Sequence, residues 1–254
     1  VVACSGGTDS LALLAIAIAA GLDPVAAHVD HGLRDGSSEE GRDVELVARR
    51  LGARFLGTTA SVPSGSGLEA RARDARYEAL ERARVELGAD WVLVAHTMDD
   101  QAETVLLNLL RGSAAAGLGG MPARRGHLCR PILALRRSET AAICDLLDIH
   151  PIDDPMNRDV SYRRVWIRNE VLPMLERGAD RDLRPVLARQ AKVLRAESDY
   201  LDDLAMGVLA GAGNPPEAAA LVEAPAVLAR RAVRLWLGPP PPSLDEVDGV
   251  IEVA

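Results

Sequence analysis

Residues 1–20, VVACSGGTDSLALLAIAIAA, begin as an apolar run of strand length and continue, through two glycines, as an apolar stretch of helix length. Gly6 and Gly7 tolerate backbone angles and close approaches that other residues resist, so the chain can turn sharply between the two elements. A strand that passes directly into a helix is typical of a unit in which a second, parallel strand follows. This stretch constrains the fold more than any other part of the chain.

The same alternation continues through the first half of the chain. Apolar runs of strand length cover residues 1–4, 25–29, 54–58 and 91–95, and apolar residues at helical spacing cover 10–20, 38–51 and 68–87. This order predicts an α/β fold, a parallel sheet with helices on both faces. Ligands of such sheets bind beyond the carboxyl ends of the strands, where residues 5–9, 28–34 and 96–100 fall.

From Asp182 onward the sequence changes to amphipathic helical patterns separated by glycine and proline. This change predicts a small all-α domain after the first one. We expect a catalytic domain over residues 1–178, a linker near residues 177–182 and a helical domain over residues 179–254. The chain begins at Val1, inside the first expected strand and without a methionine, so we expect further residues before it in the full protein.

The loop SGGTDS has the composition of a phosphate-binding turn. A turn from a strand into a helix presents N–H groups to an anion at the positive end of the helix, and Ser5 and Ser10 add hydroxyl donors. Asp9 repels phosphate, so its presence indicates a magnesium ion between the carboxylate and the phosphates. The loop is neither a Walker A motif nor a dinucleotide-binding motif. The alternative is a plain tight turn, capped by Asp9 or Ser10.

Histidine and acidic side chains follow two other strands, in HVDH (residues 28–31) and HTMDD (residues 96–100). These residue types at strand ends could also build a two-metal hydrolase site. Asp99, Asp100 and Glu103 open a helix, where one of them is expected to cap it. A cluster of three carboxylates also suits recognition of an ammonium group.

The motifs together resemble one enzyme family. SGGTDS is similar to the pyrophosphatase loop of the N-type ATP pyrophosphatases, the PP-loop superfamily. The further stretches HVDHGLR, EARARDARYEAL, AHTMDDQAETVLLNLLRGS, GLGGM and DDPMNRDVSYRRVWIRNEVLPML, within residues 28–175, resemble the tRNA(Ile)-lysidine synthases. The resemblance covers about residues 1–175 closely and the helical tail loosely.

The resemblance implies a ligase that uses ATP and Mg2+. ATP adenylates the C2 oxygen of the wobble cytidine in an isoleucine tRNA with a CAU anticodon, and the ε-amine of free L-lysine then displaces AMP to give lysidine. Partners are therefore this tRNA and lysine, and a homodimer is left open. Without a signal segment or an apolar run of membrane-spanning length, we expect no membrane and a cytoplasmic protein.

The resemblance also assigns roles to residues. The catalytic residues are Asp9, Asp99, Asp100 and Arg73; ATP is bound by Ser5, Gly6, Gly7, Thr8, Asp9, Ser10 and His31, with Asp9 on the magnesium; the lysine or adenylate pocket holds His96, Glu103, Arg76 and Arg111; tRNA is bound by Arg163, Arg164 and Arg168. For Arg73, an intrahelical pair with Glu69 is the alternative.

The formal net charge of −8 does not at first suggest a nucleic-acid substrate, but the charge is unevenly distributed. Residues 156–195 hold ten basic and five acidic side chains, a basic stretch that suits contact with a phosphate backbone or, alternatively, forms a solvated helix surface. Tyr162 and Trp166 within it could stack on bases or anchor the domain junction.

Two features limit the resemblance. Val165 stands where the family pattern leads us to expect asparagine, and the further domains that family members often carry are not recognisable. The rival functions are a tRNA thiolase of the same fold, which the three widely spaced cysteines do not favour, a metal-dependent phosphohydrolase, and a tRNA-binding module without activity.

Overall fold

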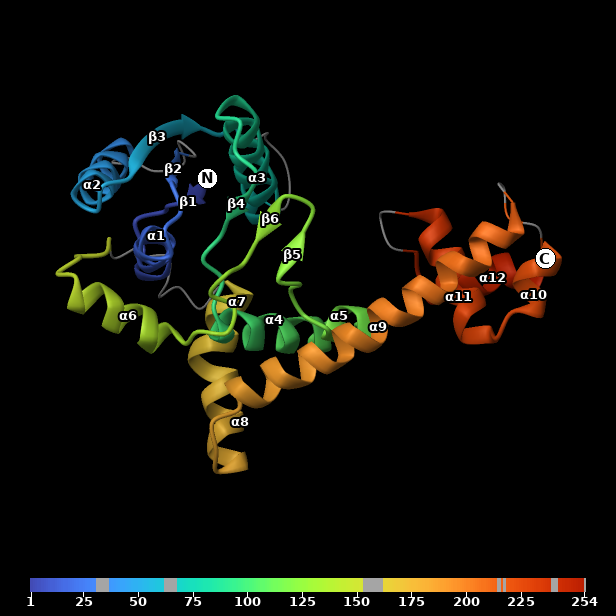
Figure 1. Cartoon of the computed structure of the whole chain (residues 1–254). Coiled ribbons are helices and arrows are strands. Elements are labelled where there is room, and N and C mark those ends of the chain that lie inside the picture. Colours follow the sequence, from blue (N-terminus) through green and yellow to red (C-terminus); the bar gives the residue numbers. More distant parts are fainter. Residues whose placement is uncertain are drawn as a thin grey trace. The chain divides into compact units, whose positions relative to one another are not determined.

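The computed structural model describes residues 1–30, 37–61, 68–152, 162–213, 216, 218–238 and 242–253 (Figure 1). The chain forms two compact units. Unit 1 comprises Val1–Leu107 and Met121–Ala188, and unit 2 comprises Asn108–Gly120 and Arg189–Ala254.

Unit 1 is built on a six-stranded sheet with the strand order β3-β2-β1-β4-β6-β5. All neighbouring strands pair in parallel except β5 and β6, which are antiparallel. The predicted α/β fold is therefore confirmed, with one antiparallel edge strand that the sequence patterns did not indicate. The strands are β1 (Val2–Ala3), β2 (Val25–Asp30), β3 (Arg54–Thr59), β4 (Val92–Leu93), β5 (Arg124–Arg125) and β6 (Leu128–Cys129).

Helices connect these strands and continue into unit 2. The helices of unit 1 are α1 (Thr8–Ala19), α2 (Ser37–Arg50), α3 (Leu68–Glu86), α6 (Arg137–Leu146), α7 (Arg163–Trp166), the π-helical turn η2 (Ile167–Val171) and α8 (Leu172–Ala179). Two helices, α4 (Met98–Leu110) and α9 (Arg184–Ala212), run from unit 1 into unit 2, which also holds α5 (Ala115–Leu118), α10 (Ala218–Glu223), α11 (Ala226–Leu237) and α12 (Leu244–Val253).

The sheet is covered on both faces because successive residues of its strands point to opposite sides. Val2 packs with Leu13 of α1 and Val44 of α2, whereas Val1 packs with Leu80 of α3. Figure 1 shows α3 on the other side of the strands from α1 and α2. These two apolar layers hold the amino-terminal turn of α1 at the carboxyl end of β1.

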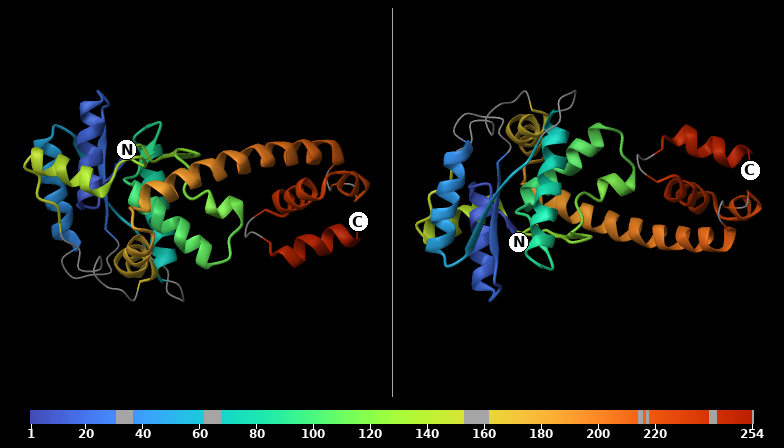
Figure 2. Two further views of the ribbon diagram at one scale, coloured as in Figure 1. Left: turned by 90° about the horizontal axis from the view of Figure 1, so that it is seen from below. Right: turned by 90° about the horizontal axis from the view of Figure 1, so that it is seen from above.

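Helix α1 is apolar around most of its circumference because it is buried on two sides. Leu13 and Leu14 face the sheet, while Leu11 packs on Cys144 of α6. Both views of Figure 2 show α6 beside α1. This packing brings the first turn of α6, far along the sequence, next to the glycine loop.

Unit 2 has a small helical core of its own. Ala205 of α9 packs with Leu221, Val233 and Val247 from the three following helices. Among the described residues of the chain, no helix is long and apolar enough to cross a membrane.

A domain boundary after residue 178 stays an expectation, and the two compact units divide within α9. Helix α8 ends at Ala179 and is followed by Asp180, whose φ is +48°, and the chain turns where the linker was expected. Helix α9 then runs without interruption through the division at residues 188–189, and residues 108–120 join unit 2. A continuous helix carries no break in its sequence pattern, so the periodicity indicated the turn and not the limit of the compact unit.

Candidate functional site

The candidate site lies at the carboxyl ends of β1 and β4. These two strands are neighbours, with Val2 opposite Leu93, although two strands and three helices separate them in the sequence. At such a point the strand order reverses, and the loops after the two strands diverge to opposite sides of the sheet. The loop after β1 is SGGTDS, and the segment after β4 leads into α4, so the two predicted site segments meet.

The glycine loop has the form of an anion cradle. Gly6 adopts a φ of +85°, and a side chain there would collide with Ile152. Gly7 precedes α1, and its carbonyl oxygen accepts hydrogen bonds from the Ser10 N–H at 3.1 Å and the Ser10 hydroxyl at 2.8 Å. No side chain caps α1. The N–H groups of Thr8 and Asp9, which precede the first bonded N–H of the helix, are therefore left for a ligand, and this argues against the plain capped turn.

Asp9 faces α6 from the first turn of α1. Its Oδ1 accepts a hydrogen bond from the Thr140 hydroxyl at 2.5 Å, and its Oδ2 lies 3.7 Å from Nε of Arg137. Burial raises the pKa of the Asp9 carboxyl above its ordinary value, although the hydrogen bond from Thr140 opposes this.

The surroundings of Asp9 fit a magnesium ion that is shared with phosphates. No group of three ligating side chains gathers anywhere in the described part of the chain. Mg2+ commonly binds one or two carboxylates together with substrate phosphates and water, and a single partly exposed Asp9 beside the anion cradle suits this arrangement.

Asp100 caps α4. Its Oδ2 accepts hydrogen bonds from the Thr97 N–H at 2.8 Å and the Thr97 hydroxyl at 2.9 Å. Burial disfavours the charged carboxylate, but the guanidinium groups of Arg137 and Arg164 and the Thr97 N–H hold the pKa of Asp100 below its ordinary value. Asp100 is therefore a charged group, fixed in place before any ligand binds.

Glu103 is a buried acid on which three arginines converge. Its side chain is 1% exposed, and its oxygens lie 2.7 Å from Nη1 of Arg137, 2.7 Å from Nε of Arg168 and 3.3 Å from Nε of Arg164. Arg137 also places its Nη2 2.5 Å from Oδ1 of Asp100. One guanidinium of α6 thus connects the two acids of α4 with Asp9 of the glycine loop.

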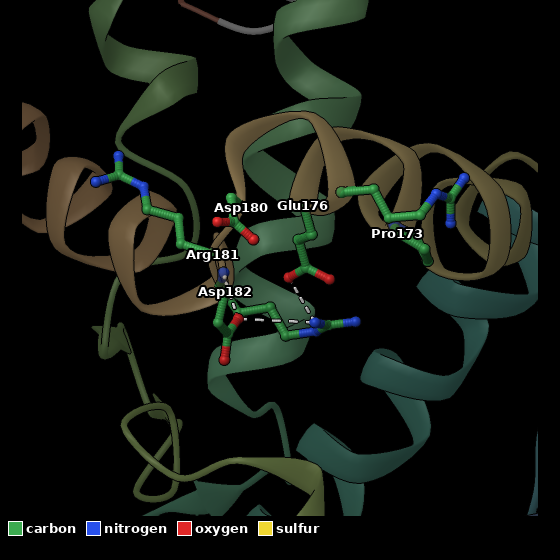
Figure 3. Close-up of a pocket in the computed structure, with 7 residues that line it drawn as sticks. Pro173, Glu176, Asp180, Arg181 and Asp182 are labelled. Atoms are coloured by element: carbon green, nitrogen blue, oxygen red, sulfur yellow. Dashed lines mark hydrogen bonds and ion pairs between the residues drawn. The ribbon is translucent and has the colours of Figure 1, made fainter.

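Asp99 belongs to a second chain of ion pairs. Its oxygens lie 3.3 Å from Nε of Arg136 and 3.0 Å from Nε of Arg184. Arg184 also pairs with Glu176 at 2.6 Å and lies 3.7 Å from an oxygen of Asp182. These three residues line a surface hollow at the turn from α8 to α9 (Figure 3). Acidic and basic groups in this hollow neutralise one another, so its role is to anchor the start of α9.

His96 lies between the acids and a group of arginines. Burial lowers the pKa of His96 to about 3, because the nearby Asp100 offsets only part of the effect of burial and of Arg130, Arg164 and Arg76. The imidazole is therefore neutral at physiological pH. Its buried Nδ1 has no hydrogen-bond partner among the described residues.

The structure brings many of the predicted site residues together and leaves others apart. Asp9, Asp100 and Glu103 meet through Arg137, while Arg73 and Arg76 lie over the ring of Tyr77 on α3. The intrahelical alternative for Arg73 involves Glu69, whose side chain lies outside the described residues, as does His31. Arg111 is exposed and belongs to unit 2.

The basic residues expected on the tRNA divide into two kinds. Arg164 and Arg168 turn inward to Glu103, whereas Arg163 is exposed and lies over the ring of Trp166 at 5.7 Å. Two of the three charges are thus used inside the protein, since the acids of α4 need partners once buried. Val165, which stands in place of the expected asparagine, is buried.

Several site residues escaped the sequence analysis. Arg136, Arg137 and Thr140, in the first turn of α6, supply most of the contacts to the predicted acids, and Arg130 follows the short strand β6. Their sequence signal was a capping box, in which the backbone N–H of Arg136 donates to Glu139 at 2.7 Å. This signal marks the helix start and says nothing of the partner.

Comparison with known proteins identifies the family. A family model described as a PP-loop domain matches residues 1–175. The tRNA(Ile)-lysidine synthase of Nocardia farcinica is 44% identical over 239 residues, which cover 93% of this chain and 74% of the relative. That of Rhodococcus erythropolis is 45% identical over 240 residues, covering 93% and 73%.

A solved structure supports the fold. The U34-tRNA thiolase from Methanococcus maripaludis, solved with its 4Fe-4S cluster, superposes with a TM-score of 0.62 over 76% of this chain and 71% of its own. At 17% identity this likeness concerns the fold alone.

Proposed function

Because this chain belongs to the tRNA(Ile)-lysidine synthase family of PP-loop ligases, we propose that it ligates L-lysine to C2 of the wobble cytidine in an isoleucine tRNA with a CAU anticodon. In the first step the C2 oxygen attacks the α-phosphorus of ATP and pyrophosphate leaves. In the second step the ε-amine of lysine attacks C2, and AMP leaves with the oxygen. Both steps proceed without a covalent bond to the protein.

The observation that carries this proposal is the meeting of the glycine loop with the acids of α4 at the point where the strand order reverses. Ser5 to Ser10 bind the pyrophosphate end of ATP through backbone N–H groups and hydroxyls, and His31 contributes to the adenosine. Uncapped N–H groups in a fixed loop stabilise the charge that builds on the leaving pyrophosphate.

Asp9 holds the magnesium ion in this proposal. When bound, Mg2+ neutralises charge on the leaving pyrophosphate. Thr140 anchors one oxygen of the Asp9 carboxylate by a hydrogen bond, and Arg137 lies 3.7 Å from the other, so the carboxylate is held in one orientation beside the loop.

The acids of α4 shape the site for the second step. Asp99, Asp100 and Glu103 are each held by arginines, so they place lysine through a prearranged charge pattern, with Asp100 the acid nearest to His96. Neutral His96 can exchange hydrogen bonds with the adenylate without adding charge. Arg73 supplies a guanidinium to phosphate, and Arg163 and Trp166 contact the tRNA.

A tRNA thiolase is the second candidate within the fold, and the cysteines argue against it. Cys4, Cys129 and Cys144 are all buried, and burial raises the pKa of Cys4, beside the glycine loop, to about 12. A thiol in this state is a poor nucleophile at neutral pH.

The proposal is tested by incubating the protein with a CAU isoleucine tRNA transcript, ATP, Mg2+ and radiolabelled lysine. We expect label in that tRNA and none in a methionine tRNA transcript. Radiolabelled ornithine and cysteine serve as controls for the amine and for thiolation. Absence of lysine transfer, or transfer of ornithine at the same rate, contradicts the proposed substrate.

A further inference from the structure

A group of cationic and polar side chains from α3 and from the ends of β4 and β6 makes no ion pair with an acid among the described residues. The guanidinium carbons of Arg73 and Arg76 each lie 5.7 Å from the centre of the Tyr77 ring. Burial lowers the pKa of the Arg130 guanidinium below its ordinary value, and nearby arginines lower it as well. The Tyr77 hydroxyl opposes this shift only in part. The partly buried arginines around Glu103, by contrast, are paired with that carboxylate.

Arg130 is the most deeply buried member of this group. It directly follows β6, whose Cys129 carbonyl accepts a hydrogen bond from the N–H of Val94 at 2.9 Å, so Arg130 lies at the same sheet edge as His96. Only 6% of Arg130 is exposed. Its Nη1 donates to the Pro122 carbonyl at 2.8 Å, and its Nε has no acceptor in the described part of the chain.

A buried cation without a counter-ion is costly, because burial removes water that one backbone carbonyl does not replace. A buried polar atom without a hydrogen-bond partner is costly for the same reason. The buried Nε of Arg76 and Nδ1 of His96 also have no hydrogen-bond partner among the described residues. Arg76 and His96 are only partly buried, so a ligand reaches the group from their side.

We propose that Arg130, Arg76 and His96 form a binding subsite for an oxyanion of a substrate, beside the glycine loop. Two planar guanidinium groups suit the paired oxygens of a carboxylate or a phosphate, and a neutral imidazole adds a hydrogen bond. The subsite rests on the proposed function, which offers two sources of this chemistry: the α-carboxylate of lysine and a phosphate of the tRNA next to the target nucleotide.

The test variant is Arg130→Met in the full chain, with Arg125→Met as the matched control. Arg125 is an exposed arginine on the neighbouring strand β5, near enough for its charge to act on Arg130, so the control removes one positive charge from the same region and leaves the three side chains of the subsite in place. Equilibrium binding is measured for L-lysine, for 1,5-diaminopentane, which is lysine without its carboxylate, and for the tRNA transcript.

Loss of a charge-assisted contact predicts about 10- to 100-fold weaker binding of the substrate that carries the anion. If the source is lysine, R130M binds lysine no better than 1,5-diaminopentane, whereas wild type and R125M prefer lysine. If the source is tRNA, R130M weakens tRNA binding and leaves lysine binding unchanged. Binding of both substrates within about twofold of wild type overturns the subsite.

Thermal unfolding separates a binding role from a structural one. Because Arg130 is buried and the described residues give it no counter-ion, we expect R130M to melt at or above the wild-type temperature while binding is lost. A variant that is destabilised and still binds like wild type shows a structural role and overturns the proposal. If R130M does not fold, Arg76→Met takes its place, with the same expected loss.

Failure of the proposed function is distinguishable from failure of the subsite. Lysine transfer by the wild type with unchanged substrate binding in R130M removes only the subsite. If the wild type binds neither lysine nor tRNA, the proposed function fails and inorganic phosphate becomes the probe. Phosphate is then expected to raise the melting temperature of wild type and R125M more than that of R130M, and equal shifts in all three overturn the subsite.

Discussion

Replacing Glu103 with glutamine removes the negative charge on which Arg137, Arg164 and Arg168 converge. The three guanidinium groups are each about a quarter exposed, at 26–28%, and the acid is 1% exposed, so water does not replace the lost charge. The glutamine keeps the size of the side chain, so the effect is electrostatic and not a cavity.

The size of the effect follows from this burial. Removing one partner of a buried ion pair costs roughly 3–5 kcal/mol, because the other partner keeps its desolvation penalty. In a domain of 150–250 residues 1 kcal/mol shifts Tm by about 2–4 °C, so E103Q is expected to melt roughly 6–20 °C below wild type. Arg137 keeps its ion pair with Asp100, whereas Arg168 loses the carboxylate with which it pairs.

The assay is thermal unfolding, with Glu81→Gln as the control. Glu81 pairs with Arg84 at 2.7 Å on α3, where water screens the pair, so the loss of this charge is expected to change Tm little. Adding Arg168→Met to E103Q removes one of the unpaired cations and is expected to recover part of the loss. If E103Q melts within about 2 °C of wild type, or if the second change lowers Tm further, the reasoning is refuted.

Three further predictions concern the loop, the pH dependence and a helix end. Gly6→Ala is expected to lower Tm, because Gly6 has a φ of +85° and a Cβ there would collide with Ile152. Gly7→Ala is expected to keep Tm but to weaken ATP binding in a titration. Equal losses of Tm in the two variants would contradict this. The pKa of Asp100 is below its ordinary value, so its carboxylate stabilises the folded state fully above about pH 4, and this contribution is lost as the pH falls through the folded-state pKa. The free energy of unfolding of Asp100→Asn should therefore change less with pH below about pH 4, which acid unfolding measures. Asp180→Gly, at a φ of +48°, should stabilise the end of α8 by about 1 kcal/mol in urea unfolding, and a loss of stability contradicts the strain.

Much of the fold could be predicted from the sequence because its signals are local. The apolar runs 25–29 and 54–58 match β2 and β3 almost residue for residue, since strand length and apolar character identify them. β5 and β6 have two residues each, too few to show alternation. Their place in the sheet depends on pairing with β4, which no local pattern encodes.

The acids of the site could be predicted, and their partners could not. Asp99 and Asp100 follow a strand and open a helix, and both features are visible in the sequence. Arg137 reaches Asp100 from 37 residues away and Thr140 reaches Asp9 from 131 residues away, because α6 packs on α1 in three dimensions. Long-range pairs of this kind depend on the packing of whole helices.

The basic stretch shows what a charge count leaves open. Arg164 and Arg168 both pair with the buried Glu103, a contact that the count of basic residues did not indicate. Each arginine stays about a quarter exposed, so its contact with tRNA phosphates stays a prediction. A net charge says which groups are present and not which of them pair with one another.

ATP labelled at its α-phosphate shows which phosphorus is attacked when the nucleotide lies at the loop SGGTDS. With this ATP, CAU isoleucine tRNA and lysine, we expect labelled AMP in equal amount with lysine bound to tRNA, and we expect Asp9→Asn to abolish both. Labelled ADP in place of AMP would mean that the α-phosphorus is not the atom attacked and would overturn the proposed reaction.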